Sequence, residues 1–89
     1  MDVERLQRRY TDLLLERVEE TRFPSNDHLN RIESSLATDE QAERYVRILM
    51  EKVEETRYPS VSLLDRVRRV LEALAARETS SRAREDGRR

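Results

Sequence analysis

The sequence lacks cysteine and tryptophan, and it contains only one glycine, two prolines and four aromatic residues. Without cysteine the chain has no disulfide, no thiolate nucleophile and no cysteine-ligated metal site. The single glycine, Gly87, excludes a glycine-rich phosphate-binding loop. No apolar run approaches the roughly 20 residues of a membrane-spanning helix, and the N-terminus is charged from its second residue, unlike a signal peptide. We therefore expect a cytoplasmic protein that does not contact membranes.

Charged residues are abundant, at 42% of the chain against 36% apolar residues. In 89 residues this composition predicts one small domain with a modest hydrophobic core. The net charge of −1 argues against nucleic acid as a partner, because nucleic-acid-binding domains are usually strongly basic. Arginine occurs 17 times and lysine once, which favours a high-GC bacterial or phage genome as the source.

The chain repeats itself at a spacing of 35 residues. The octet "VEETRFPS" (residues 18–25) returns as "VEETRYPS" (residues 53–60), with one Phe-to-Tyr change. Over the longer window, residues 10–36 and 45–71 align without a gap and share 13 identities in 27 positions. We interpret this as a tandem duplication, with a first unit at about residues 3–37 and a second unit at about residues 38–77.

Each unit is predicted to form a helix, a tight break and a second helix. Apolar residues of the first segment fall on an arc of roughly 200° at 100° per residue, wide enough to contact two neighbouring helices. Pro24 and Pro59 end the first helix of each unit, because a residue before proline avoids the helical region. Ser25 and Ser60, or Asp27 and Ser62, cap the following helices, and Thr38 with Gln41 opens the third. The expected helices are 3–22, 26–37, 39–57 and 61–77.

These helices predict an all-α fold. Because stacked repeat arrays usually need three or more units, we expect the two hairpins to close into a small four-helix bundle around a pseudo-twofold axis. The four-helix domain would span residues 1–77. The charged segment 78–89 has almost no apolar residues and is predicted to be a disordered C-terminal tail.

Groups that could carry catalysis are scarce. The only histidine, His28, corresponds to Leu63 in the second unit, which is typical of a boundary residue of the core. Six recurring glutamates (Glu16, Glu19, Glu20, Glu51, Glu54 and Glu55) lie opposite the apolar arc, and no Glu-x-x-His motif accompanies them as in bundle-type di-iron sites. We expect no enzyme activity, no metal and no cofactor.

The recurring charges favour a protein-interaction module acting as an adaptor, assembly or regulatory subunit. The candidate site is a Glu/Arg surface presented once in each unit, formed by Glu19, Glu20 and Arg22 and by Glu54, Glu55 and Arg57. Its expected partner is another protein with a basic docking surface. A simpler interpretation is a solvated face held by i,i+3 ion pairs such as Arg17–Glu20 and Lys52–Glu55.

A DNA-binding regulator is the alternative function. The stretch "YPSVSLLDRVRRVLEAL" resembles the recognition helix of helix-turn-helix regulators, in which Ser or Thr near the helix start and Arg further along face the major groove. The resemblance implies that the fourth helix, 61–77, would contact DNA through Ser60, Ser62, Arg66, Arg68 and Arg69. The glycine-containing turn that usually precedes such a helix is replaced by "ETRYPS".

Self-association is a further expectation. The fourth helix carries Leu63 and Val70 where the first unit has His28 and Ser35, so its apolar side is wider. This excess fills the core or, alternatively, forms the contact of a homo-oligomer or a groove for a partner helix.

Overall fold

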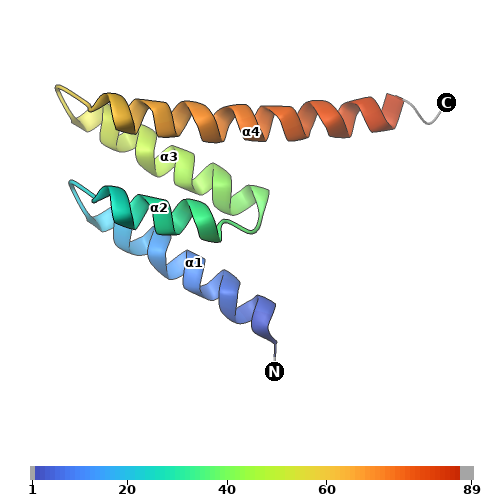
Figure 1. The fold of residues 1–89 in the computed structure, drawn as a ribbon, viewed down its shortest axis with the longest axis horizontal. Coiled ribbons are helices and arrows are strands. Elements are labelled where there is room, and N and C mark those ends of the chain that lie inside the picture. Colours follow the sequence, from blue (N-terminus) through green and yellow to red (C-terminus); the bar gives the residue numbers. More distant parts are fainter. Residues whose placement is uncertain (1, 87–89) are drawn as a thin grey trace.

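The computed structural model describes residues 2–86, and within that range the chain is entirely helical and turn-like, without a strand. Four helices follow one another: α1 (Val3–Glu20), α2 (Asn26–Ser35), α3 (Asp39–Glu55) and α4 (Val61–Asp86) (Figure 1). The predicted all-α fold is confirmed. The predicted helix bounds lie within two residues of the observed ones, except at the end of α4.

Side-chain caps explain where the helices begin. In each case an oxygen of the residue before the helix accepts a hydrogen bond from a backbone N–H in the first turn, which would otherwise lack a partner. The capping residues are Asp2, Ser25, Thr38 and Ser60. Gln41 completes the cap of α3, because its Oε1 accepts from the backbone N–H of Ala37 at 3.1 Å. α1 and α3 end at Thr21 and Thr56, which have extended backbones.

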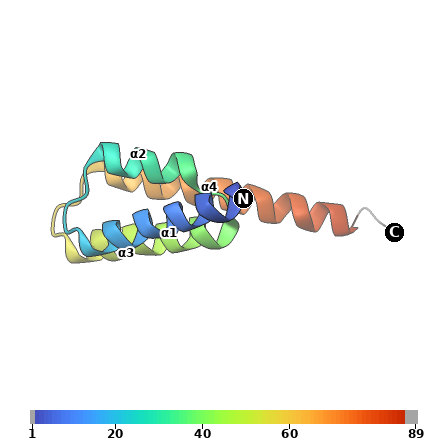
Figure 2. The same cartoon turned by 90° about the horizontal axis from the view of Figure 1, so that it is seen from below.

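The hairpins are arranged in two layers, with α1 and α3 in one layer and α2 and α4 in the other (Figure 2). α1 packs against α2 and α3, and α3 packs in turn against α4. Within residues 2–86 no Cα of α2 lies within 8 Å of a Cα of α4. The hairpins therefore form an open stack in which both point the same way, and the ring of contacts of the expected closed bundle is not formed.

The hydrophobic core lies between the two units. Its buried members are Leu15, Val18, Leu29, Ile32, Tyr45, Ile48 and Leu49. Leu14, Leu36, Leu63, Val67 and Val70 pack against them from the periphery. Leu63 and Val70 thus contribute to the core, as the core-filling interpretation of the wide fourth helix expected. α2 and α4, by contrast, are linked by charged side chains, with Arg66 and Arg69 of α4 facing Glu33 of α2.

α4 is the longest helix and extends beyond the other three (Figure 1). The structure differs here from the expected disordered tail, because residues 78–86 continue the helix; residues 87–89 lie outside the described range. No proline or glycine occurs between Pro59 and Gly87, and five of the nine residues in 78–86 are Ala, Arg or Glu, which favour helices. An ion pair between Arg77 Nη1 and Asp39 Oδ1, at 2.5 Å, ties α4 to the start of α3.

No helix in the described part of the chain combines the length and the apolar character that crossing a membrane would require.

Candidate functional site

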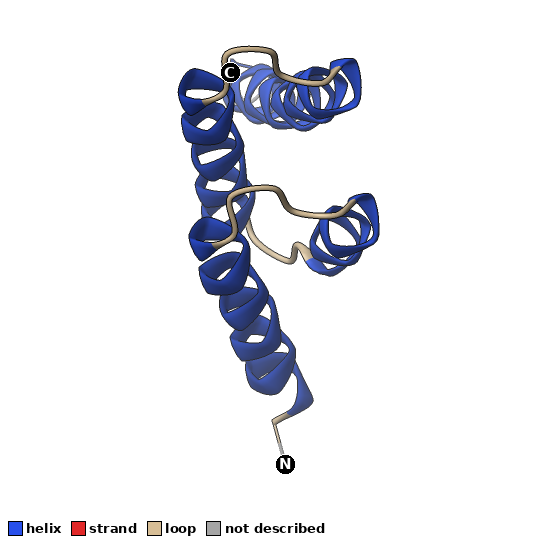
Figure 3. Cartoon of the chain, turned by 90° about the vertical axis from the view of Figure 1, so that its left-hand side faces the viewer, coloured by secondary structure: helices blue, strands red, loops and turns tan. Residues whose placement is uncertain are grey.

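The repeated octets cover the last turn of α1 or α3, the loop that follows, and the cap of α2 or α4. The two loops lie side by side at one end of the molecule (Figure 3). Several octet residues have clear structural roles. Val18 is buried, Ser25 and Ser60 are helix caps, and the Thr21 hydroxyl donates to the carbonyl oxygen of Arg17 at 2.8 Å.

The aromatic residues of the octets have no such role. Phe23 and Tyr58 are 74% and 82% exposed. Each lies under the arginine that precedes it, with the guanidinium carbon of Arg22 5.5 Å and that of Arg57 5.6 Å from the ring centroid. The sequence analysis treated these rings only as part of the helix break. Four aromatic residues occur in the whole chain, and the exposure of two of them at matching positions is therefore unusual.

A cavity of about 210 Å³ opens between the two loops. The first loop contributes Arg22, Phe23 and Pro24 to its wall, and the second contributes Tyr58, Pro59 and Ser60. Leu29 and Leu63 also line it. The loops together therefore form a recess whose wall combines both aromatic rings with polar groups that include Arg22 and Lys52.

Of the predicted Glu/Arg residues, Arg22 lines this recess, and the other five lie at or next to the helix ends that lead into the loops. Glu19, Glu20 and Arg22 lie at the end of α1, and Glu54, Glu55 and Arg57 lie at the end of α3; all six are exposed. Glu19 pairs with Arg44 across the α1–α3 contact, at 3.4 Å. None of the expected i,i+3 ion pairs occurs in the part of the chain whose side chains are described, so Glu20 and Glu55 have no cationic partner there.

Lys52 has a role that the sequence did not reveal. It is buried, and its Nζ donates to the carbonyl oxygens of Glu19 and Thr21 at 3.2 and 2.6 Å. These carbonyls lie at the C-terminal end of α1, where a cation is favoured by the helix dipole. The only signal in the sequence was that this is the single lysine among 17 arginines.

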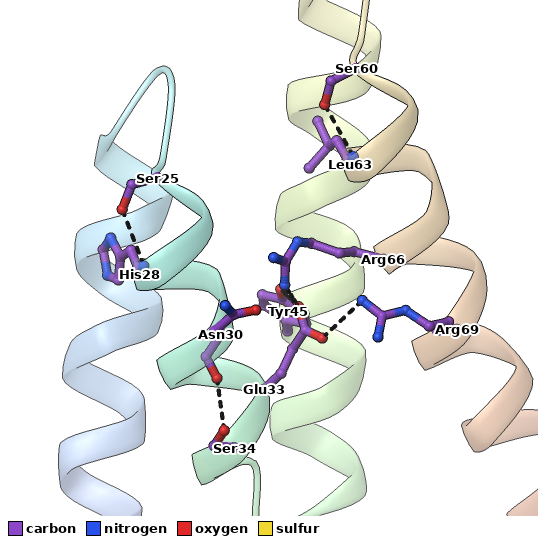
Figure 4. A network of polar contacts seen from close by, with 10 residues as sticks. All are labelled: Ser25, His28, Asn30, Glu33, Ser34, Tyr45, Ser60, Leu63, Arg66 and Arg69. Atoms are coloured by element: carbon purple, nitrogen blue, oxygen red, sulfur yellow. Dashed lines mark hydrogen bonds and ion pairs between the residues drawn. The ribbon is translucent and has the colours of Figure 1, made fainter.

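A polar network joins α2, α3 and α4 (Figure 4). The carboxylate of Glu33 accepts from the Tyr45 hydroxyl at 2.6 Å and from Arg66 Nη1 at 2.5 Å, and Arg69 Nη2 lies 3.6 Å from it. Burial, reinforced by the Glu33 carboxylate, holds the pKa of Tyr45 far above its usual value. The hydroxyl of Tyr45 therefore remains a hydrogen-bond donor at every physiological pH.

This network bears on the DNA-binding alternative, because two of the residues predicted to contact DNA, Arg66 and Arg69, belong to it. Arg66 is 6% exposed and pairs with Glu33, and the Ser60 hydroxyl is engaged in capping α4. Ser60 and the other three predicted DNA-contacting residues, Ser62, Arg68 and Arg69, are exposed. Arg68 lies 3.7 Å from Glu72, and Arg69 faces Glu33. Of the five predicted residues, only Arg66 is thus buried and removed from the surface.

His28 is half-buried, next to the Ser25 cap, whose hydroxyl accepts from the backbone N–H of His28. Among the described residues no group of three or more His, Asp or Glu side chains is arranged to hold a metal ion.

Comparison with protein-family models, with curated proteins and with solved structures finds no match for this chain. The functional assignment therefore depends on the residues of the chain and on their geometry.

Proposed function

We propose that this chain is a non-enzymatic protein-interaction module that binds a partner protein at its paired loops. We name the binding region the twin-loop surface and define it by the end-of-helix glutamates and the arginine–aromatic pairs: Glu20, Arg22, Phe23, Glu55, Arg57 and Tyr58. The observation that carries the proposal is the exposure of Phe23 and Tyr58 in matching settings on either side of one recess.

The composition of this surface is that of a binding site. Aromatic residues and arginine are enriched in protein interfaces, and an aromatic ring buries about 150–250 Å² when covered. Fully burying a large apolar side chain contributes about 1.5–3 kcal/mol, so covering both rings would contribute roughly 3–6 kcal/mol before the costs of association. The rings would therefore supply only part of the binding free energy, and we expect the neighbouring charges to add to it.

The carboxylates of Glu20 and Glu55 indicate the charge expected of the partner. Glu20 and Glu55 are exposed at the ends of α1 and α3, three residues before the rings in the sequence, and have no cationic partner among the described side chains. We therefore expect a partner segment that places an apolar side chain in the recess and a Lys or Arg next to each carboxylate. This agrees with the basic docking surface predicted from the sequence.

The experiment is a selection of random peptides displayed on phage against the purified full-length chain. The selected peptides should combine basic residues with an aromatic or aliphatic residue. Their binding should weaken about tenfold or more when Phe23 and Tyr58 are changed to Ser, and when Glu20 and Glu55 are changed to Lys.

A matched control uses Glu16→Lys with Glu51→Lys. These glutamates are exposed and repeated at the same spacing, but they lie one helical turn away from the loops. Peptides that lose binding equally in both sets of variants, or in neither, would contradict the twin-loop surface.

A further inference from the structure

A second surface is left open because the first unit has no neighbour on the side where the second unit has one. On α1, the apolar side chains of Val3, Leu6, Tyr10 and Leu13 are between 47% and 55% exposed. We call this the open α1 face. The spacing of three, four and three residues forms one continuous stripe along the helix, as in a helix that packs against another helix.

The same positions of α3 are covered by the first unit. Gln41, Tyr45 and Ile48 correspond to Leu6, Tyr10 and Leu13, and they are 7%, 0% and 4% exposed. The contact between α3 and the first unit therefore shows how a surface equivalent to the open α1 face is buried.

The contact between the two units depends on charged groups as well as on apolar packing. There, three cations of the second unit bind groups of the first: Arg44 pairs with Glu19, Lys52 caps the end of α1, and Arg66 pairs with Glu33. The corresponding residues of the first unit are Arg9, Arg17 and Arg31, all exposed. In the region whose side chains are described, these three arginines form no ion pair, and the Tyr10 hydroxyl forms no hydrogen bond.

From this correspondence we infer that the open α1 face binds an acidic helical hairpin of another protein. The first helix of the partner lies parallel to α1, as α1 lies beside α3. Its apolar side covers the stripe and its C-terminal carbonyls accept from Arg17. The second helix of the partner places a carboxylate between Tyr10 and Arg31, as α2 places Glu33 between Tyr45 and Arg66. The surface runs along α1 away from the twin loops, so this inference does not depend on the twin-loop surface.

A second copy of the chain is a poor occupant for this face. Its exposed outer side chains, Met50, Leu64 and Leu71, could cover the apolar stripe. Its residue equivalent to Glu33, however, is Arg68. Arg68 would meet Arg31 and bring no acceptor to the Tyr10 hydroxyl, so end-to-end stacking of copies places like charges together.

The probe is the first unit itself, residues 1–37, because its outer side already binds the equivalent surface of the second unit. The fragment is labelled at its C-terminus, held at low concentration and titrated with the full-length chain while fluorescence anisotropy is measured. We expect saturable binding that weakens about tenfold when the chain carries Arg31→Glu. Glu33→Arg in the probe should weaken it equally, and the two changes together should restore part of the binding.

Arg47→Glu in the chain is the matched control, because Arg47 is an exposed arginine of α3 that belongs neither to the open α1 face nor to the twin-loop surface; it should leave binding of the probe unchanged. If the separate fragment does not fold, residues 1–36 are joined directly ahead of residues 2–89. Hydrogen exchange then reports protection of the α1 segment of the intact chain, with Glu33→Arg in the added unit as the control.

The inference is overturned if neither the separate fragment nor the fused chain shows binding. It is also overturned if binding is unchanged by Arg31→Glu and by Glu33→Arg. Sedimentation of the chain alone tests whether a second copy of the chain binds the open α1 face. If the chain self-associates and Leu6→Glu with Leu13→Glu abolishes that association, the face belongs to a second copy and the inference is wrong. Selection results at the twin-loop surface do not affect either outcome.

Discussion

Tyr10 and Tyr45 occupy matching positions in the two halves of the chain, yet the first is half exposed and the second is completely buried. The same contrast separates Leu13 from Ile48, Arg17 from Lys52, and Arg31 from Arg66. Local sequence therefore does not decide which of these residues belong to the core. What decides it is whether another unit packs against the helix: within the described residues the first unit covers this side of α3, and no helix covers the matching side of α1.

The sharpest way to test this comparison is to truncate one matched pair of aliphatic residues. Ile48→Ala should lower the free energy of unfolding by about 2–5 kcal/mol, because it leaves a cavity in the core between the units. Leu13→Ala should lower it by less than about 1 kcal/mol, since half of that side chain is already in water. Urea denaturation followed by circular dichroism measures both, and equal losses would show that the units have equivalent surroundings.

The arginine pair should show a smaller difference. Arg66→Met removes the main cation that faces Glu33 and should cost about 2 kcal/mol, because the carboxylate is 20% exposed and keeps only Tyr45 and Arg69. Arg31→Met changes an exposed side chain and should stay within about 0.5 kcal/mol of the wild type. The same denaturation experiment applies, and a loss of similar size at Arg31 would indicate an interaction within the first unit.

The smallest expected effect concerns the end of α1. Lys52→Met keeps much of the buried stem but removes the ammonium group that binds the carbonyls of Glu19 and Thr21, at a cost of about 1 kcal/mol. The loss should appear as faster hydrogen exchange in the last turn of α1. Arg17→Met is the control, because Arg17 is exposed and α1 has no preceding helix to cap. Unchanged exchange in the Lys52→Met variant would show that the cap does not hold this turn.

The helices themselves could be predicted because their signals are local. Pro24 and Pro59 fix the breaks, and Ser25, Thr38 and Ser60 are capping residues whatever lies around them. The prediction of a disordered segment at the end of α4 was wrong for a related reason. Few apolar residues in segment 78–86 suggested disorder, but a helix already started needs no apolar face to continue until a breaker such as Gly87.

The arrangement of the helices could not be predicted in the same way. A wide apolar arc on α1 can be buried in a closed bundle or in an open stack, and hydrophobic periodicity does not distinguish them. The deciding residues are Glu33, Arg66 and Lys52, whose partners lie in another helix. In the sequence they look like ordinary surface charges, which is why Arg66 was assigned to DNA binding.

Part of the candidate site could be predicted from the sequence and part could not. Glu19, Glu20, Arg22 and their counterparts lie around the loops and on the surface, as their opposition to the apolar arc indicated. The exposure of Phe23 and Tyr58 could not be foreseen, because an aromatic residue before proline can pack against its own helix or project away from it. Only the three-dimensional course of the loops decides between these alternatives.

The amine of Lys52 also links the folding of the two units. In a chain of repeats the stability of the whole depends on the intrinsic stability of each unit and on the free energy of the contact between neighbours. Here that contact includes the backbone carbonyls that terminate α1, so the last turn of α1, in the first unit, is completed by a side chain of the second unit. Opening of α3 would withdraw the cap and expose the end of α1 at the same moment. The two halves are thereby coupled into one cooperative unit, although most of their hydrogen bonds are confined to separate hairpins.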